Sequence, residues 1–340
     1  MSTKKTVFVA MSGGVDSSVS AYKMLQEGHN VIGVTLDMKR KGDQEAVDDA
    51  RIVADKLKIE HIVLNTSDDY KDKVLEYFKN SYIGGETPNP CVMCNRFVKF
   101  KFLIDLMREK GGDFIATGHY ARIINSDGEF KLFRAKNLKK DQSYFLSYIN
   151  KEYLQYIKFP LGDVVSKDDV RRIASEIGLH NALKHDSQDI CFIDTDYKDF
   201  LKKNDVNFKK GLIKHVNGEI LGKHDGIINY TIGQRRGLGI AYEKPIYVVK
   251  IDAADNVVYV GDEEDLFNRT FKIRNLNALG DIDGKTEYTF KLRSTHIGQN
   301  GFINLDDMTV TLNEGSRAIT KGQLCVMYNG EQVVGSGWIV

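Results

Sequence analysis

The residues best suited to chemistry lie near the start and in the middle of the chain. The apolar run Thr6 to Ala10 ends in a polar turn with the sequence Met11-Ser12-Gly13-Gly14-Val15-Asp16-Ser17-Ser18. Farther on, Cys91 and Cys94 form a C-x-x-C pattern, and Cys191 stands far from both in the sequence. Adjacent glycines and hydroxyls suit the binding of an anion, whereas thiols suit redox, metal or nucleophilic chemistry.

The polar turn is predicted to join a strand to a helix. Val15, Val19 and Leu25 have helical spacing, and Gly28 follows as a C-terminal signal. The first N–H groups of such a helix are unpaired, so an anion is the natural ligand. Asp16 would repel phosphate unless Mg²⁺ lies between them. The Walker signature is absent, because no Lys follows the second glycine.

The stretch S-G-G-V-D-S-S resembles the PP-loop of ATP pyrophosphatases, which cleave ATP to AMP and pyrophosphate. The alternative is a Gly-Gly turn without a ligand. We favour the PP-loop, because six specific residues fall at one strand-to-helix junction where anion binding is physically expected.

The C-x-x-C pattern allows several interpretations. Cys91 and Cys94 could be a redox pair, half of a zinc site, part of an iron–sulfur site, a nucleophile with its neighbour, or buried structural residues. Asn95 is predicted to cap a helix that begins just after Cys94. Because a helix N-terminus lowers a thiol pKa, Cys94 is expected to be a reactive thiolate. Cys325, between Leu324 and Val326, is expected in the core.

The elements that must position these residues indicate an α/β fold. Buried strands alternate with helices over the first part of the chain, which is typical of a parallel sheet with ligands at the carboxyl ends of its strands. From about residue 205, short β-type runs separated by glycine replace the helical patterns. We expect an N-terminal parallel-sheet PP-loop domain (adenine nucleotide alpha hydrolase-like) at 1–204, a small β-rich central domain at 205–269 and a C-terminal antiparallel β-barrel at 270–340.

Composition limits the function classes. The chain has 340 residues, with 48 Lys plus Arg against 47 Asp plus Glu, so contacts to nucleic acid must come from local patches. Four cysteines do not make a disulfide scaffold in a chain of this length, and a cytoplasmic location is expected. No run approaches the roughly 20 apolar residues that span a bilayer, so no membrane partner is expected.

Four further motifs extend the resemblance to one family. They are Thr87-Pro88-Asn89-Pro90 with Cys94-Asn95, Ala116-Thr117-Gly118-His119-Tyr120-Ala121, Lys140-Asp141-Gln142-Ser143-Tyr144-Phe145, and Asp186-Ser187-Gln188 with Ile190-Cys191-Phe192-Ile193. Together they closely resemble the tRNA-specific 2-thiouridylases, which replace the 2-carbonyl oxygen of the wobble uridine by sulfur. Asn229 to Gly239 and Gly335-Ser336-Gly337 look like later segments of the same family. The resemblance therefore covers almost the whole chain in the right order.

The resemblance implies a role for each matching position. ATP contacts fall on Ala10, Met11, Ser12, Gly13, Gly14, Val15, Asp16, Ser17, Met38 and Gly118. The nucleophile falls on Cys94 and the persulfide carrier on Cys191, while target-base contacts fall on Asn89, Pro90 and Cys91. Wider tRNA contacts fall on His119, Lys140, Asp141, Gln142, Arg293, Ser294 and Gln323. The implied partners are tRNA and a sulfur donor, either a cysteine desulfurase or a sulfur relay protein, and the implied cofactors are ATP and Mg²⁺.

The chain also departs from the family. Many members have Asp at the position of Cys91, and an aromatic residue commonly stands at the position of Ser294. With Cys91, Cys94 and Cys191 the chain offers three thiolates, enough for a 4Fe–4S cluster with one open iron, as an alternative to a persulfide relay. The stretch between Met38 and Glu45 is short for the family, which we expect to alter one surface of the site. Other PP-loop enzymes, such as amide-forming synthetases, and a noncatalytic tRNA-binding protein remain the alternative functions.

Overall fold

The computed structural model describes residues 4–182, 190–193, 196–204, 206 and 209–340. The chain divides into two compact units. The first unit comprises residues 1–74, 91–192 and 331–334, and the second comprises residues 75–90, 193–330 and 335–340. The Asp186-Ser187-Gln188 part of the fourth motif lies outside the described residues.

A parallel sheet forms the centre of the first unit. Among the described residues its strand order is β3-β2-β1-β4-β7, and each neighbouring pair is parallel. The strands are β1 (Thr6–Ala10), β2 (Asn30–Asp37), β3 (Glu60–Asn65), β4 (Phe114–Ala116) and β7 (Ile157–Lys158). Val7, Phe8 and Val9 of the central strand are fully buried, as a strand covered on both faces requires. The edge strand β3 is only partly buried, so the expectation of burial on both faces is wrong for that strand.

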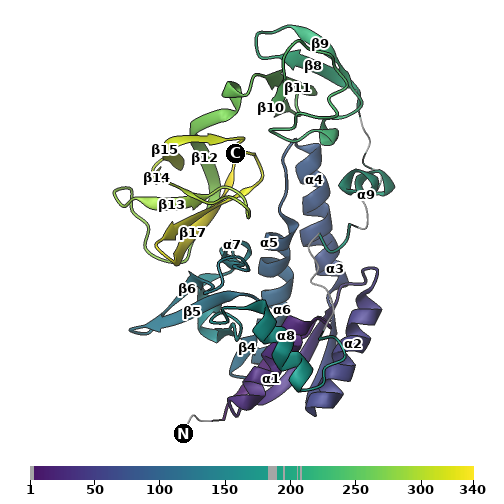
Figure 1. Ribbon diagram of the computed structural model, residues 1–340, viewed down its shortest axis with the longest axis vertical. Coiled ribbons are helices and arrows are strands. Elements are labelled where there is room, and N and C mark those ends of the chain that lie inside the picture. Colours follow the sequence, from purple (N-terminus) through teal and green to yellow (C-terminus); the bar gives the residue numbers. More distant parts are fainter. Residues whose placement is uncertain (1–3, 183–189, 194–195, 205, 207–208) are drawn as a thin grey trace. The chain divides into compact units, whose positions relative to one another are not determined.

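Helices cover this sheet. Those of the first unit are α1 (Val15–Gln26), α2 (Asp43–Leu57), α3 (Ser67–Tyr70), α5 (Pro90–Cys94), α6 (Phe100–Glu109), α7 (Ser143–Leu146) and α8 (Lys167–Glu176). α1 and α8 run side by side and share a core with α2 (Figure 1), built around Val19, Val53, Val170 and Ala174. This packing fixes the first turn of α1 at the end of β1.

The helix that carries the C-x-x-C pattern begins earlier than predicted. It starts at Pro90, continues through a π-helical turn at Asn95–Lys99 and runs on as α6. Proline suits the first turn of a helix because its missing N–H is not needed there. The predicted N-cap role of Asn95 is therefore wrong: its side-chain amide donates to the Phe145 carbonyl over 3.0 Å.

Three local patterns in the sequence can be compared with the structure: Ser126-Asp127-Gly128 predicts a hairpin turn, Ser166 with Asp169 predicts a capping box, and Gly178 predicts the end of that helix. β5 (Ala121–Ser126) and β6 (Glu129–Arg134) form the hairpin, with positive φ at Asp127 and Gly128. Gly178 ends the α8 segment with φ 68°. Ser166 caps α8 by accepting the Asp168 N–H, but the Asp169 carboxylate pairs with Arg172, so the capping box is only half formed.

The second unit contains a four-stranded sheet and a barrel. The sheet has the order β10-β11-β8-β9 and comprises β8 (Gly211–His215), β9 (Ile220–His224), β10 (Tyr247–Asp252) and β11 (Val257–Gly261). The helices α4 (Tyr77–Ile83) and α9 (Tyr197–Lys203) contact each other through the stacked rings of Tyr82 and Tyr197, whose centroids are 4.7 Å apart.

The barrel is the predicted C-terminal one. Its strands are β12 (Phe267–Ala278), β13 (Tyr288–Lys291), β14 (Gln299–Asn304), β15 (Thr309–Arg317), β16 (Leu324–Asn329) and β17 (Gln332–Ile339). β12 pairs with both β15 and β17, which closes the ring of six described strands. Closure removes the exposed sheet edge. Cys325 is fully buried in this barrel, as predicted.

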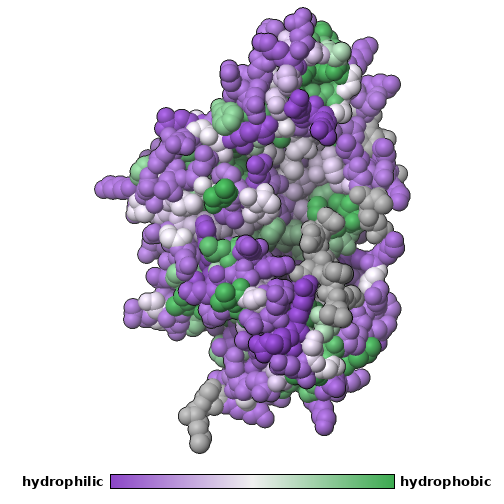
Figure 2. All heavy atoms as spheres, viewed as in Figure 1, coloured by the Kyte–Doolittle hydropathy of each residue, from purple (hydrophilic) through white to green (hydrophobic). Residues whose placement is uncertain are grey.

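In the part of the chain that the structure describes, no helix is both long and apolar enough to cross a bilayer. The face in Figure 2 is mostly hydrophilic, with apolar residues scattered in small groups. All four cysteines are free thiols.

The barrel core gives a test of the fold. Phe290 is fully buried in β13, so Phe290→Ala should lower the free energy of unfolding by about 3–5 kcal/mol. Phe302→Ala in β14 is the matched control, because that ring is already 39% exposed and its loss should cost less than about 1 kcal/mol. Fluorescence of the single tryptophan, Trp338 in β17, reports denaturant unfolding of the barrel. Equal effects of the two substitutions would contradict the assigned core.

Candidate active site

The Ser12–Ser17 loop follows β1 and leads directly into α1. The Ser17 and Ser18 hydroxyls both donate to the Gly14 carbonyl over 2.9 Å, and the Ser12 N–H donates to Ser17 Oγ over 3.2 Å. Gly13 has φ 71°, and a Cβ there would lie 2.8 Å from the Ala46 carbonyl oxygen. Only glycine allows this approach of the loop to α2. The loop is thus held open at the helix N-terminus, where N–H groups can face an anion.

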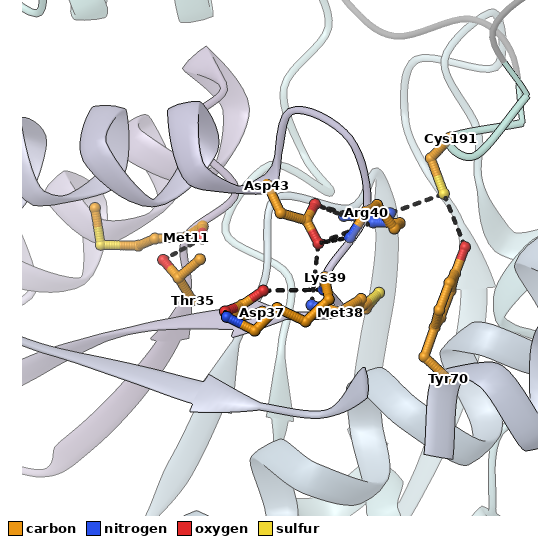
Figure 3. A network of polar contacts seen from close by, with 9 residues as sticks. All are labelled: Met11, Thr35, Asp37, Met38, Lys39, Arg40, Asp43, Tyr70 and Cys191. Carbon is orange, nitrogen blue, oxygen red and sulfur yellow. Dashed lines mark hydrogen bonds and ion pairs between the residues drawn. The ribbon is translucent and has the colours of Figure 1, made fainter. Parts of the chain in front are cut away.

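The residues predicted to contact the nucleotide gather at one edge of the sheet. Met38 follows β2, and Gly118 follows β4, the two strands that flank β1. Gly118 lies directly against the loop, since a Cβ there would lie 2.8 Å from the Ser17 backbone nitrogen. Beneath the loop, the Thr35 hydroxyl donates to the Met11 carbonyl over 2.8 Å (Figure 3). The structure therefore brings together the predicted set 10–17, 38 and 118.

Three residues that the sequence did not point out support this loop. The Lys167 ammonium lies 2.6 and 2.7 Å from the two carboxylate oxygens of Asp16. The Tyr120 hydroxyl donates to Asp16 over 2.8 Å. The buried Asn181 amide donates to the Gly13 carbonyl over 2.9 Å and to Ser18 Oγ over 3.0 Å. Tyr120 stood inside a quoted motif, but nothing in the local sequence around Lys167 or Asn181 indicates that they reach the loop.

Cys91 and Cys94 lie one turn apart on α5. Cys94 is only 5% exposed, and burial raises its pKa to about 11 although Lys99 opposes the shift. Burial also raises the pKa of Cys91. The prediction that Cys94 is a reactive thiolate at a helix N-terminus is therefore wrong for this free form, because the helix begins at Pro90 and the thiol is buried within it. Cys191 also contributes to raising both pKa values, by less than burial does.

Cys191 is exposed, and its sulfur is held by two side chains. Arg40 Nη1 donates to Cys191 Sγ over 2.8 Å, and the Tyr70 hydroxyl lies 3.8 Å from the same sulfur (Figure 3). Burial raises the pKa of Tyr70, so this hydroxyl keeps its proton. The sulfur therefore meets a fixed positive charge and a neutral hydroxyl.

Asp43 fixes the Arg40 side chain. Its carboxylate accepts from Arg40 Nη2 over 2.8 Å and from Nε over 3.0 Å, and also accepts the Met38 N–H over 3.0 Å. Burial disfavours the Arg40 cation, but these bonds and the nearby Cys191 hold the pKa of Arg40 above its ordinary value. This network lies in the stretch between Met38 and Glu45, and through Arg40 it contacts Cys191.

The structure gives no support for a cluster site. Among the described residues, no group of three or more His, Cys, Asp or Glu side chains is arranged to hold a metal ion, and this includes Cys91, Cys94 and Cys191.

The residues predicted to contact tRNA in the first unit differ in their charge and in the hydrogen bonds that they already make. Burial lowers the pKa of His119 to about 3, with Lys99 adding to the effect, so its ring is neutral at physiological pH. The Asp141 carboxylate accepts the N–H groups of Ala135 and Ser143 over 3.0 and 3.1 Å, and Gln142 Oε1 accepts the Tyr120 N–H over 2.9 Å. Asp141 and Gln142 therefore fix the conformation of the loop that contains Lys140. Lys140 lines an open hollow of about 580 Å³ together with Lys136, Lys139 and Lys167.

The predicted contacts of the second unit fall in two places. Arg293, Ser294 and Gln323 line one pocket of about 290 Å³, which also contains Arg317 and His296. The Gln323 amide donates to the Thr87 carbonyl over 2.9 Å. Asn89 is buried, and its N–H donates to the Tyr77 hydroxyl over 3.3 Å, immediately before Pro90 opens α5.

Comparison with protein-family models defines the class of this protein. Three family models match in succession: the tRNA methyl transferase HUP domain at residues 5–195, the tRNA methyl transferase PRC-barrel domain at residues 198–262 and the aminomethyltransferase beta-barrel domain at residues 268–339. Together with the loop at the end of the parallel sheet, they define a three-part protein built on a HUP-type nucleotide-binding fold.

The relatives define the family. The chain is 48% identical to the tRNA-specific 2-thiouridylase MnmA of Rickettsia massiliae (strain Mtu5), over 99% of this chain and 97% of the relative. It is 46% identical to the enzyme of the same name from Rickettsia akari (strain Hartford), over 98% and 96% of the two chains. The chain belongs to the tRNA-specific 2-thiouridylase family, which confirms the resemblance seen in its motifs.

The burial of the thiols predicts their order of reactivity. Near neutral pH, iodoacetamide should alkylate the exposed Cys191 before Cys91 and Cys94, as mass spectrometry of the digested enzyme can measure. Below the Cys94 pKa of about 11, its thiolate fraction and labelling rate should rise about tenfold per pH unit. Lys99→Met should slow labelling of Cys94 further, because Lys99 lowers that pKa.

Lys101→Met is the matched control for this measurement. It removes the same charge from the same helical segment, but Lys101 pairs with Asp105 over 2.9 Å and is not among the groups that shift Cys94. Rapid labelling of Cys94 at neutral pH would show that its thiol is ionised in the free enzyme and would contradict this account.

Proposed function

We propose that this protein is an ATP-dependent tRNA 2-thiouridylase. It converts the wobble uridine of tRNA to 2-thiouridine and releases AMP and pyrophosphate. The main support is the presence, in one compact unit, of a PP-loop and of two cysteines at the positions of the nucleophile and the persulfide carrier. Family membership over nearly the whole chain supports the same conclusion. The four free thiols suit a reducing cytoplasm.

ATP is needed because the uracil oxygen is a poor leaving group. In the proposed first step this oxygen attacks the α-phosphorus of ATP, an O–P bond forms, and pyrophosphate leaves with the electrons of the broken bond. The loop N–H groups would face the developing negative charge, and Mg²⁺, when present with the nucleotide, would supply further positive charge there. The set 10–17, with Met38 and Gly118 on the flanking strands, would hold the nucleotide for this step.

Sulfur is supplied in the second step. A donor protein, a cysteine desulfurase or a sulfur relay protein, leaves a sulfane sulfur on Cys191. The exposure of Cys191 suits this delivery, and the Arg40 donor suits an anionic sulfur. The Cys94 thiolate then attacks the Cys191 sulfur, which forms a Cys94–Cys191 disulfide and releases hydrosulfide. Hydrosulfide attacks the activated carbon, AMP departs, and a thiol reductant restores the two cysteines.

Cys94 must lose its proton for this step. Its pKa of about 11 leaves it protonated in the free form, so the reaction requires a change around Cys94 when substrates bind. Lys99 can contribute to this change, since its charge already lowers that pKa, more than the charge of Arg40 does.

The tRNA contacts follow from the same assignment. A stacked anticodon base is out of reach of a buried thiol, so the wobble uridine should be splayed out and held by Asn89, Pro90 and Cys91. His119, being neutral and placed against Phe100 and Phe159, suits a base better than a phosphate. Lys140, with Asp141 and Gln142 shaping its loop, and the pocket of Arg293, Ser294 and Gln323 suit the tRNA backbone.

The decisive assay is mass spectrometry of nucleosides from unmodified tRNA incubated with enzyme, ATP, Mg²⁺ and a sulfur donor. We expect 2-thiouridine from the wild type and none from Cys94→Ser or Cys191→Ser. Cys325→Ala is the control, because that thiol is buried in the barrel and should be dispensable for activity. Absence of 2-thiouridine with the wild type would refute the function. Product from Cys191→Ser would favour another PP-loop chemistry.

The same preparation separates the two sulfur mechanisms. Iron and acid-labile sulfide are measured after anaerobic purification. Full activity of an iron-free enzyme supports the persulfide relay with Cys91 as a bystander or resolving thiol, whereas activity that tracks iron content would replace it by a 4Fe–4S cluster held by the three cysteines.

Gly118→Ala tests the geometry of the nucleotide loop. The new methyl group would lie 2.8 Å from the Ser17 nitrogen and 2.9 Å from the Asp16 carbonyl carbon, so the loop must shift. We expect a loss of stability of about 1–3 kcal/mol and at least a tenfold weaker binding of ATP, measured by calorimetry. In Gly315→Ala, the control in β15, the nearest atom is 3.5 Å away, and ATP binding should not change. Unchanged ATP affinity in Gly118→Ala would contradict the assigned loop.

A further inference from the structure

The loop at residues 86–89, which leads into α5, is attached to the barrel through the backbone of Thr87. The Thr87 N–H donates to the Lys321 carbonyl over 2.8 Å, and the Thr87 carbonyl accepts the Gln323 side-chain amide over 2.9 Å. Lys321 and Gln323 stand in the turn between β15 and β16. All of these residues belong to the second unit, so the attachment lies within one compact part of the chain.

The peptide bond between Pro88 and Asn89 is held at both of its polar ends. The Asn89 N–H donates to the Tyr77 hydroxyl over 3.3 Å, and the Pro88 carbonyl lies 3.5 Å from the Gln323 amide nitrogen. Tyr77 in turn packs on Trp338 of β17, with ring centroids 5.7 Å apart. Proline also restricts the backbone of this loop by fixing its own φ. The orientation of Asn89 is therefore set by groups that belong to the barrel or rest on it.

Two further contacts fix the start of the same loop. Gly322 has φ 83°, and a Cβ there would lie 2.7 Å from Glu86 Cβ and 3.0 Å from the Thr87 nitrogen. Arg274 Nη2 of β12 donates to both carboxylate oxygens of Glu86, over 2.9 and 2.8 Å. An exposed ion pair contributes little, but the Glu86 side chain is only 18% exposed. The barrel therefore contacts three successive residues of the loop, 86 to 88.

The same turn lines the pocket that the proposed function gives to the tRNA backbone. Thr87 and Gln323 both line this pocket of about 290 Å³, together with Arg293 and Ser294. Gln323 is thus shared between the pocket and the loop, since its amide is bonded to the Thr87 carbonyl. Binding of the tRNA backbone and placement of the loop depend on one turn of the barrel.

We propose that Gln323 is a positioning residue for recognition of the wobble base, and that it acts through the backbone of Thr87 and Pro88 on Asn89. The inference rests on the proposed function, in which Asn89 contacts that base. A contact of this kind needs a geometry held to within about 0.5 Å, and a residue on a loop reaches this precision only when its backbone is fixed. The barrel thus takes part in base recognition without touching the base.

Binding of two tRNAs that differ at one base tests this role without ATP or a sulfur donor. One is an unmodified tRNA with a wobble uridine, and the other is the same tRNA with cytidine in that place. By fluorescence anisotropy, the wild type should prefer the uridine form at least about tenfold. Gln323→Met keeps the length of the side chain but removes its N–H donors. We expect the preference to fall below about threefold, while affinity for the cytidine form changes less than about twofold.

Three further variants serve as comparisons. Gln155→Met is the matched control, because Gln155 is exposed in the 3₁₀ helix Lys151–Tyr156 and donates to the Glu152 carbonyl of that helix over 3.1 Å; its preference should equal that of the wild type. Arg293→Met should weaken both tRNAs equally, as loss of a backbone contact does. Arg274→Met should lower the preference in the same direction as Gln323→Met, by a smaller factor.

Each outcome decides for or against the positioning role. Equal losses for both tRNAs in Gln323→Met would make Gln323 a direct contact of the tRNA backbone and overturn the proposal, as would an unchanged preference. Fluorescence of Trp338 during denaturant unfolding shows whether the variant is folded; if it is not, an unchanged preference in Arg274→Met overturns the proposal instead.

The proposed function fails in a different way from this inference. A wild type that binds both tRNAs equally would overturn the inference, since no base contact would exist to be positioned, even if it makes 2-thiouridine. A wild type that prefers uridine and loses this preference in Gln323→Met, but makes no 2-thiouridine, would support the inference and contradict the proposed function.

Discussion

The first unit depends on a close approach of backbone segments at the carboxyl end of its sheet. Gly13 lies against α2, and Gly118 lies against the first turn of α1, at distances that no side chain could occupy. Asn181, which follows α8 in the sequence, donates hydrogen bonds to the Gly13 carbonyl and to Ser18 Oγ and so holds the same loop. The loop is therefore fixed from three sides while its N–H groups remain directed outward, and binding a phosphate needs little further ordering.

Charge is arranged around this loop in pairs. Asp16 forms an ion pair with Lys167, and Asp43 forms one with Arg40. The first pair joins distant parts of the chain, whereas the second lies within one loop. Both cations are poorly exposed, at 10% and 22% of their side chains, which makes their electrostatic effect stronger than that of solvated lysines. Lys167 contacts Asp16 in the Ser12–Ser17 loop, and Arg40 contacts the sulfur of Cys191. The two halves of the proposed reaction thus each have a fixed positive charge.

The two thiols of the proposed reaction differ in their burial and in their charged neighbours. Cys94 is enclosed and its pKa is raised to about 11, whereas Cys191 is exposed beside Arg40. An exposed sulfur can receive a sulfane atom from a donor protein, and an enclosed one is protected from oxidation until it is needed. A buried thiol in the resting form is consistent with a nucleophile that is activated only when substrates are bound.

The sequence by itself determined the fold class, the strand-to-helix loop, the hairpin, the barrel and the family, because these follow from apolar periodicity, turn residues and motifs in a fixed order. It did not reveal that the helix of Cys94 begins at Pro90, since proline fits both a break and a first turn. The partners of Asp16 and Cys191 were decided only by tertiary structure. Lys167 lies 151 positions from Asp16, and Arg40 lies 151 positions from Cys191. Pairing at that separation depends on how α8 and the β2–α2 loop pack, which no local pattern encodes.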